Sequence, residues 1–180
     1  MNIPGRNVEG IYPAMDFLPL QNKAVSGEIK NSEIKINAKD KHVVVIGGGD
    51  TGSDCIGTSF RQGAKKVTQL EIMPMPPKRE NKELTWPYWP HKLRTSSSQE
   101  EGAVRDWSVM TKSFKTANGK VKGLECIKLD SSLKPIKNSE FFIKADLVLL
   151  AMGFVHPKHC LLYTSPSPRD MTGSRMPSSA

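Results

Sequence analysis

Short apolar runs, separated by long polar stretches, predict the buried strands of a central sheet. The first run, residues 43–46, is continuous and β-branched. Residues 67–71, which include polar residues, are a second strand-like run, and residues 147–151 are a third, again continuous and apolar. Runs of this kind are typical of strands in a parallel sheet that is covered on both faces. The pattern therefore predicts an α/β fold.

A helix is predicted between the first two runs, from residue 51 to about residue 62. Ile56 and Phe60 lie four residues apart on one helical face, and Gly63 is well placed to end the helix. Strand, helix and strand then form a βαβ unit, so the two strands should be parallel neighbours.

Two alternating runs meet at Asn118 and Gly119, and this dipeptide is a strong signal for a β-hairpin. A further short strand is expected before residue 145. Residues 74–103 are rich in proline and polar residues, so we expect a loop with a helical turn near residues 97–103. Trp86 and Trp89, each followed by proline, either pin this loop or form a lid or a domain contact.

The chain divides into three parts. Residues 1–38 are broken by proline and glycine into turns and short pieces, residues 39–157 form the predicted domain, and residues 158–180 form a tail. The tail has a Ser-Pro-Ser-Pro run and no apolar periodicity, so we expect it to be disordered and foreign to the fold. Deleting residues 161–180 should leave the melting temperature unchanged.

The length and the charge of the chain indicate one globular domain and argue against nucleic-acid and membrane partners. The 180 residues suffice for one domain with a sizeable core. The formal net charge is +8, but the basic residues are scattered, as is typical of solvated lysines, so we expect no nucleic-acid partner. The sequence has no apolar run long enough to span a membrane and no secretory signal at residues 1–10, so we expect no membrane partner.

The three cysteines, Cys55, Cys126 and Cys160, are widely spaced and include no C-x-x-C pair. This spacing predicts neither a disulfide framework nor a metal site, and it favours a reducing compartment. Cys55 lies on the predicted helix and is expected to be a packed thiol rather than a reactive one.

Four glycines follow the first strand directly. Gly47, Gly49 and Gly52 match G-x-G-x-x-G, and Gly48 is an additional glycine. In a strand–turn–helix context this pattern predicts dinucleotide binding. Gly47 would permit the tight turn, Gly49 would let a pyrophosphate approach the backbone, and Gly52 would let the helix pack against the strand.

Neighbouring residues complete the predicted site. The N–H groups of Asp50, Thr51 and Gly52 would face the phosphates at the helix N-terminus, and the carboxylate of Asp50 is expected to cap the helix. Glu71, at the end of the second strand, is placed to accept hydrogen bonds from the adenosine ribose. The predicted fold is thus a Rossmann-like three-layer nucleotide-binding domain.

The chain resembles the nicotinamide-binding half of the small subunit (β-region) of glutamate synthase, in the segments VVVIGGGDTGSDC, GAKKVTQLEIMPMPP, WPYWP, NGKVKGLECIKL and ADLVLLAMGF. The resemblance covers about residues 3–157. The glycine motif is shared by many flavoproteins, whereas the combination of E-I-x-P-x-P-P and W-P-x-W-P is more specific to this family.

The resemblance implies a domain of the flavin disulfide-reductase type with a β-hairpin or meander insertion. It implies binding of NAD(P)H and hydride transfer to FAD. Iron–sulfur clusters and FMN elsewhere in the full enzyme would then carry electrons to glutamate formation from glutamine and 2-oxoglutarate. It also implies that Gly153 lies near the nicotinamide or the flavin. Hydride transfer requires only the orientation of two rings, so no catalytic residue is predicted.

The family's FAD motif and cysteine clusters do not occur in this chain. We therefore expect a fragment that lacks its true N-terminus and is inactive alone, with residues 1–38 leading in from a missing FAD-binding domain. Its partners would be the remaining glutamate synthase domains or the large subunit, in the cytoplasm or a plastid. Two alternatives stay open: the NAD(P)H–FAD half of another enzyme, similar to dihydropyrimidine dehydrogenase, and a non-catalytic nucleotide-binding module.

The choice of nucleotide rests on Glu71, because a carboxylate there would repel the 2′-phosphate of NADPH. Lys78 and Arg79 argue for NADPH, but Pro76 and Pro77 separate them from the strand end. The sequence therefore favours NADH.

Overall fold

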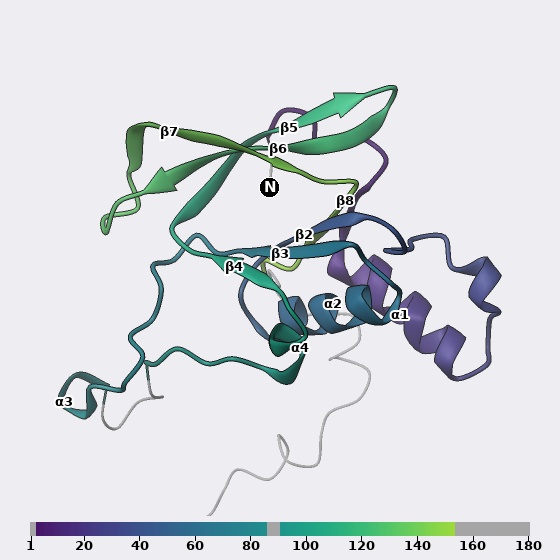
Figure 1. Cartoon of the computed structure of the whole chain (residues 1–180), viewed down its shortest axis with the longest axis horizontal. Helices are drawn as coiled ribbons and strands as arrows, with labels where there is room; N and C mark the ends of the chain where they lie inside the picture. Colours follow the sequence, from purple (N-terminus) through teal and green to yellow (C-terminus); the bar gives the residue numbers. More distant parts are fainter. Residues whose placement is uncertain (1–2, 86–90, 154–180) are drawn as a thin grey trace, which may run out of the picture.

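The computed structural model describes residues 3–85 and 91–153. These residues form three layers: an antiparallel sheet, a parallel sheet and a layer of helices (Figure 1). The Trp-Pro segment and the predicted tail lie outside the described residues. None of the helices within residues 3–85 and 91–153 has the length and apolar character needed to cross a bilayer.

The parallel sheet has five strands in the order β1-β8-β2-β3-β4. Their bounds are Ile11–Pro13 (β1), Leu147–Leu150 (β8), His42–Ile46 (β2), Lys66–Leu70 (β3) and Val104–Asp106 (β4). Strands β2 and β3 pair in parallel from His42 opposite Lys66 to Ile46 opposite Leu70. The predicted pair of parallel neighbours is therefore confirmed, and with it the α/β class.

The helical layer contains α1 (Ala14–Val25), α2 (Asp50–Arg61) and α4 (Ser97–Glu100), with η1 (Asn31–Glu33) and α3 (Lys82–Thr85) in connecting segments (Figure 1). The prediction of α2 is confirmed, as is the helical turn after residue 96. The prediction of only turns and short pieces before residue 38 is wrong for α1. Phe17 is fully buried under the sheet, and this packing keeps the helix despite Pro19 within it.

Residues 11–25 thus contribute an edge strand and a helix to the same α/β unit as the glycine motif. The proposed domain boundary at residue 38 stays a prediction, as does the origin of residues 1–38 in an FAD-binding domain.

Strand β2 separates two apolar cores, and its alternate residues face opposite sides. Val43 and Val45 pack with the helices, whereas Val44 and Ile46 pack with the antiparallel sheet. Both faces of β2 are buried, which explains why its sequence is a continuous apolar run.

The antiparallel sheet has the order β5-β6-β7, with β5 at Val109–Ala117, β6 at Lys120–Leu129 and β7 at Pro135–Lys144. The β5–β6 turn consists of Asn118 and Gly119, with φ of 52° and 73°. Positive φ at both positions is the requirement of a tight hairpin turn, so the predicted hairpin is confirmed.

Candidate functional site

Gly47 and Gly52 are glycines because other atoms of the protein leave no room for a side chain. Gly47 has a φ of 125°, and a Cβ there would collide with the carbonyl of Ala151 on the neighbouring strand end. A Cβ on Gly52 would lie 2.5 Å from the carbonyl oxygen of Gly47. These two glycines therefore form the tight turn and allow close helix–strand packing.

Residue 48 is glycine for a different reason. A Cβ at this position would collide with the carboxylate of Glu71, which lies directly against the glycine turn. Gly49, by contrast, has no atom of the described chain within 4 Å of the position that a Cβ would take, and its φ of −77° suits any residue. Nothing in the described chain requires glycine at residue 49, so its missing side chain fits the approach of a ligand.

A cavity of about 450 Å³ opens at this turn, at the carboxyl ends of the parallel strands. It is lined by residues 46–49, 70–73, 109–111 and 151–153 together with Thr51. The carboxyl edge of a parallel α/β sheet is the usual place for a ligand, and the volume is in the usual range of ligand pockets.

The structure brings six of the eight predicted site residues to this cavity: Gly47, Gly48, Gly49, Thr51, Glu71 and Gly153. Gly52 is buried behind the turn, and Asp50 is exposed on the helix. The geometry thus supports a shared site, although ligand contact by these residues stays a prediction.

The predicted capping role of Asp50 is wrong. The N-cap of α2 is Gly49, Asp50 is the first helical residue, and the cap has no side-chain hydrogen bond. The helix begins one residue earlier than predicted, so Asp50 is too far along to accept from the first turn. Its negative charge in the first turn still interacts favourably with the dipole of α2.

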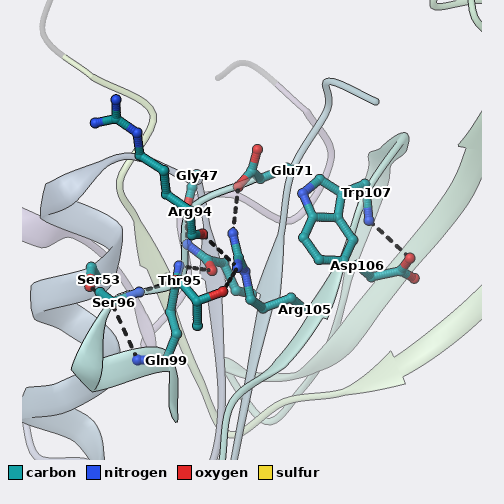
Figure 2. A network of polar contacts seen from close by, with 11 residues as sticks. Gly47, Ser53, Glu71, Arg94, Thr95, Ser96, Gln99, Arg105, Asp106 and Trp107 are labelled. Atoms are coloured by element: carbon teal, nitrogen blue, oxygen red, sulfur yellow. Dashed lines mark hydrogen bonds and ion pairs between the residues drawn. The ribbon is translucent and has the colours of Figure 1, made fainter. Parts of the chain in front are cut away.

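Glu71 follows β3 and leaves only 19% of its side chain exposed. Burial raises the pKa of its carboxyl group above the usual range, and the Arg105 guanidinium acts in the opposite direction. The Arg105 Nη2 atom lies 3.9 Å from the carboxylate (Figure 2). Glu71 is thus a partly desolvated acid facing the cavity beside one cation.

Three groups near the site were not predicted from the sequence: Gln69, Arg105 and residues 109–111. Gln69 is a polar residue inside a buried strand, which is itself a signal that a specific partner is needed. Residues 109–111 belong to the antiparallel sheet and reach the cavity because the Val109 N–H donates to the Glu71 carbonyl oxygen at 3.0 Å. No local pattern indicates that contact.

Cys55 and Cys126 are free and buried, and burial raises their thiol pKa values to about 12 and about 11. The prediction that Cys55 is a packed thiol agrees with its place in the helix-side core. Among the described residues, no cluster of three His, Cys, Asp or Glu side chains is arranged to hold a metal ion.

The layers, the glycine turn and the cavity define a Rossmann-type domain of the kind found in FAD- and NAD(P)-dependent oxidoreductases. Thioredoxin reductase of T. acidophilum has a similar fold, with a TM-score of 0.53 and 19% identity over 91% of this chain and 43% of that one. No protein-family model matches the chain.

The particular relationship comes from sequence. The chain is 46% identical to the glutamate synthase [NADPH] small chain of Mycobacterium tuberculosis, over 90% of this chain and 34% of the relative. It is 41% identical to glutamate synthase [NADH] of Schizosaccharomyces pombe, over 87% of this chain and 8% of the relative. The chain is therefore a homologue of part of glutamate synthase, as its motifs predicted.

The chain spans about a third of the small chain from M. tuberculosis and less than a tenth of the S. pombe protein. What those proteins do as wholes is consequently a proposal for this chain.

Proposed function

We propose that this chain is the NAD(P)H-binding part of a glutamate synthase and that it presents the nucleotide for hydride transfer to FAD. The observation that carries the proposal is Gly49, which faces open space at the mouth of the cavity while the neighbouring glycines are constrained by protein atoms. Homology to glutamate synthases supports the choice of nicotinamide nucleotide over another phosphate ligand.

Each part of the site has a distinct task. The first N–H groups of α2 have no partner within the helix, and they would donate to the pyrophosphate beside Gly49. The carboxylate of Glu71 would accept from the ribose hydroxyls. The strand end at residues 151–153 would support the nicotinamide, which when bound supplies the hydride.

NADH is the preferred nucleotide in this proposal. Two unit charges about 4 Å apart repel by roughly 4 kcal/mol at an effective dielectric near 20, so Glu71 would disfavour a 2′-phosphate. Lys78 and Arg79 are exposed and lie beyond the prolines that follow β3. The relatives include enzymes named for NADPH and enzymes named for NADH, so they leave this choice to experiment.

In the longer protein, FAD would accept the hydride, and iron–sulfur clusters and FMN would carry electrons to the site where glutamine and 2-oxoglutarate yield glutamate. The partners would be the remaining glutamate synthase domains or the large subunit. We place that protein in the cytoplasm or a plastid.

Titration of the full chain with NADH and NADPH, followed by nicotinamide fluorescence, tests the proposal. We expect binding of both, with tighter binding of NADH, and loss of that preference in Glu71→Ala. Absence of binding to either nucleotide would overturn the proposed function. A preference for NADPH in the unmodified chain would overturn only the role of Glu71.

A further inference from the structure

Two separate chains of polar contacts lead from the candidate site to one short segment, residues 94–99, which we call the brace segment. It includes the start of α4 and follows the Trp-Pro region in sequence. One chain of contacts begins at the glycine turn, and the other begins at Glu71 (Figure 2).

The first chain of contacts passes through Gln69, which is 1% exposed. Its Nε2 atom donates to the Gly47 carbonyl oxygen at 2.9 Å, and its Oε1 atom accepts from Gln99 Nε2 at 2.9 Å. Gln99 in turn accepts from the Ser96 N–H at 2.9 Å, and the Ser96 hydroxyl is hydrogen-bonded to the hydroxyl of Ser53 on α2. Both ends of the Gln69 amide are therefore occupied.

The second chain of contacts passes through Arg105 on β4, whose side chain is 13% exposed. Its Nη2 atom lies 3.9 Å from the Glu71 carboxylate, and its Nη1 atom donates to the Arg94 carbonyl oxygen at 3.0 Å, whereas its buried Nε atom has no hydrogen-bond partner among the described residues. The guanidinium also lies 4.8 Å from the ring centroid of Trp107. Arg105 is thus held from three directions.

These contacts bear on function because they fix the orientation of the glycine turn and the position of the Glu71 carboxylate. The carbonyl of Gly47 and the N–H of Gly48 share one planar peptide, so the bond from Gln69 sets where that N–H points. A buried amide with both ends bonded has little freedom to let the turn rotate. Arg105 similarly limits where the carboxylate of Glu71 can lie.

We propose that Gln69 and Arg105 are positioning residues through which the brace segment sets the geometry of the nucleotide site. Gln69 orients the glycine turn toward the pyrophosphate, and Arg105 orients Glu71 toward the ribose. The inference rests on the proposed function, and it predicts two different binding defects from one shared support.

The glycine-turn arm is tested with Gln69→Met, which keeps the length of the side chain and removes both hydrogen bonds. We expect the affinity for ADP-ribose and for NADH to fall by about tenfold, the value of the one hydrogen bond lost at the glycine turn, with an unchanged ratio of NADH to NADPH affinity. Gln62→Met is the matched control. Gln62 also joins two segments, through Gln21 and Ala38, but lies away from the cavity, so its substitution should leave affinity unchanged.

The ribose arm is tested with Arg105→Met. We expect NADH affinity to fall and the ratio of NADH to NADPH affinity to drop by about fivefold, because Glu71 is no longer held where it accepts from the ribose hydroxyls and opposes a 2′-phosphate. Arg105→Lys should recover part of the ratio. Arg61→Met is the control, since it removes an exposed Arg–Glu pair elsewhere on the surface.

The outcomes separate the two proposals. If the unmodified chain binds none of the nucleotides, the proposed function fails. If it binds them and Gln69→Met behaves like Gln62→Met, the positioning role of Gln69 is wrong while the function stands. If Arg105→Met weakens NADPH more than NADH, the charge of Arg105 favours the 2′-phosphate, and the proposed positioning of Glu71 by Arg105 is wrong. If Gln69→Met does not fold, Gln99→Met removes the support of Gln69 by the brace segment while leaving the bond of Gln69 to the Gly47 carbonyl, and wild-type affinity there would overturn the role of the brace segment.

Discussion

The carboxylate of Glu71 occupies the space where a side chain at residue 48 would lie. Gly48 and Glu71 come from different strand ends, yet each constrains the other. The additional glycine of the motif is therefore explained by an acid at the end of the neighbouring strand.

Substituting Gly48 by alanine should act mainly through Glu71. The atoms in the way belong to the end of a flexible side chain, so we expect the carboxylate to move aside and the fold to survive. Gly48→Ala should then reduce the preference for NADH as Glu71→Ala does. Titration of both nucleotides against Gly48→Ala, Glu71→Ala and the double variant measures this.

The double variant decides between interpretations. If Gly48→Ala acts by displacing Glu71, the double variant should have the same nucleotide preference as Glu71→Ala alone. Additive effects would mean that Gly48 contributes independently, through the backbone of the turn itself.

Gly49 and Gly52 should respond in opposite ways to added side chains. Gly49→Val meets open space, so we expect wild-type thermal stability and loss of nucleotide binding. Gly52→Ala meets the Gly47 carbonyl oxygen, a backbone atom that cannot swing away, so we expect a loss of stability of about 1–3 kcal/mol. Thermal unfolding and NADH titration of both variants test the pair. Equal NADH affinity of Gly49→Val and the unmodified chain would contradict the phosphate role of Gly49.

The parts of the fold that the sequence predicted are those whose cause is local. Strands β2 and β8 are continuous apolar runs because both of their faces are buried, and Asn118-Gly119 has the conformations that its turn needs. Strands β1 and β4 were not predicted. Each has only three residues and is stabilised by pairing with a strand that lies far away in the sequence. Arg105 and Asp106 in β4 carry no strand signal.

The candidate site divides in the same way. The glycines and Glu71 stand at fixed offsets from a strand, so a pattern can find them. Arg105 and residues 109–111 reach the cavity only through tertiary contacts. The prediction for Asp50 is wrong because the helix starts one residue early, a shift that propensities do not resolve.

Ionisation of the Glu71 carboxyl group should make the folded chain less stable as the pH rises. Its pKa is raised in the folded chain, chiefly by burial and against the effect of Arg105, so the folded state binds more protons than the unfolded state above the usual carboxyl range. The contribution of Glu71 is therefore most favourable below its unfolded pKa and is lost as the pH rises through the folded value. Glu71→Gln should gain melting temperature over the unmodified chain as the pH rises above the usual carboxyl range.

Glu125→Gln provides a control of opposite sign. Hydrogen bonds from Lys115 and Ser113 lower the pKa of Glu125, so its contribution is present above the unfolded pKa and lost as the pH falls. That variant should lose melting temperature relative to the unmodified chain as the pH rises. If Glu71→Gln follows Glu125→Gln, pairing with Arg105 outweighs burial at Glu71.

The two buried thiols should make the fold sensitive to alkali. Burial, and secondarily Asp54, raises the pKa of Cys55 to about 12, and burial raises that of Cys126 to about 11, whereas the unfolded thiols ionise near 9.0. Because the folded state keeps both protons longer, their contribution is complete below about pH 9 and is lost as the pH rises through the folded values. The urea midpoint of a Cys160→Ser variant should therefore fall toward that of the Cys55→Ala, Cys126→Ala, Cys160→Ser triple variant as the pH is raised.

In the Cys160→Ser variant at about pH 8, a thiol reagent should label neither Cys55 nor Cys126 until the chain is unfolded. Rapid labelling of the folded chain would show that Cys55 or Cys126 is accessible, and a constant gap between the urea midpoints would show that their protons are not linked to folding.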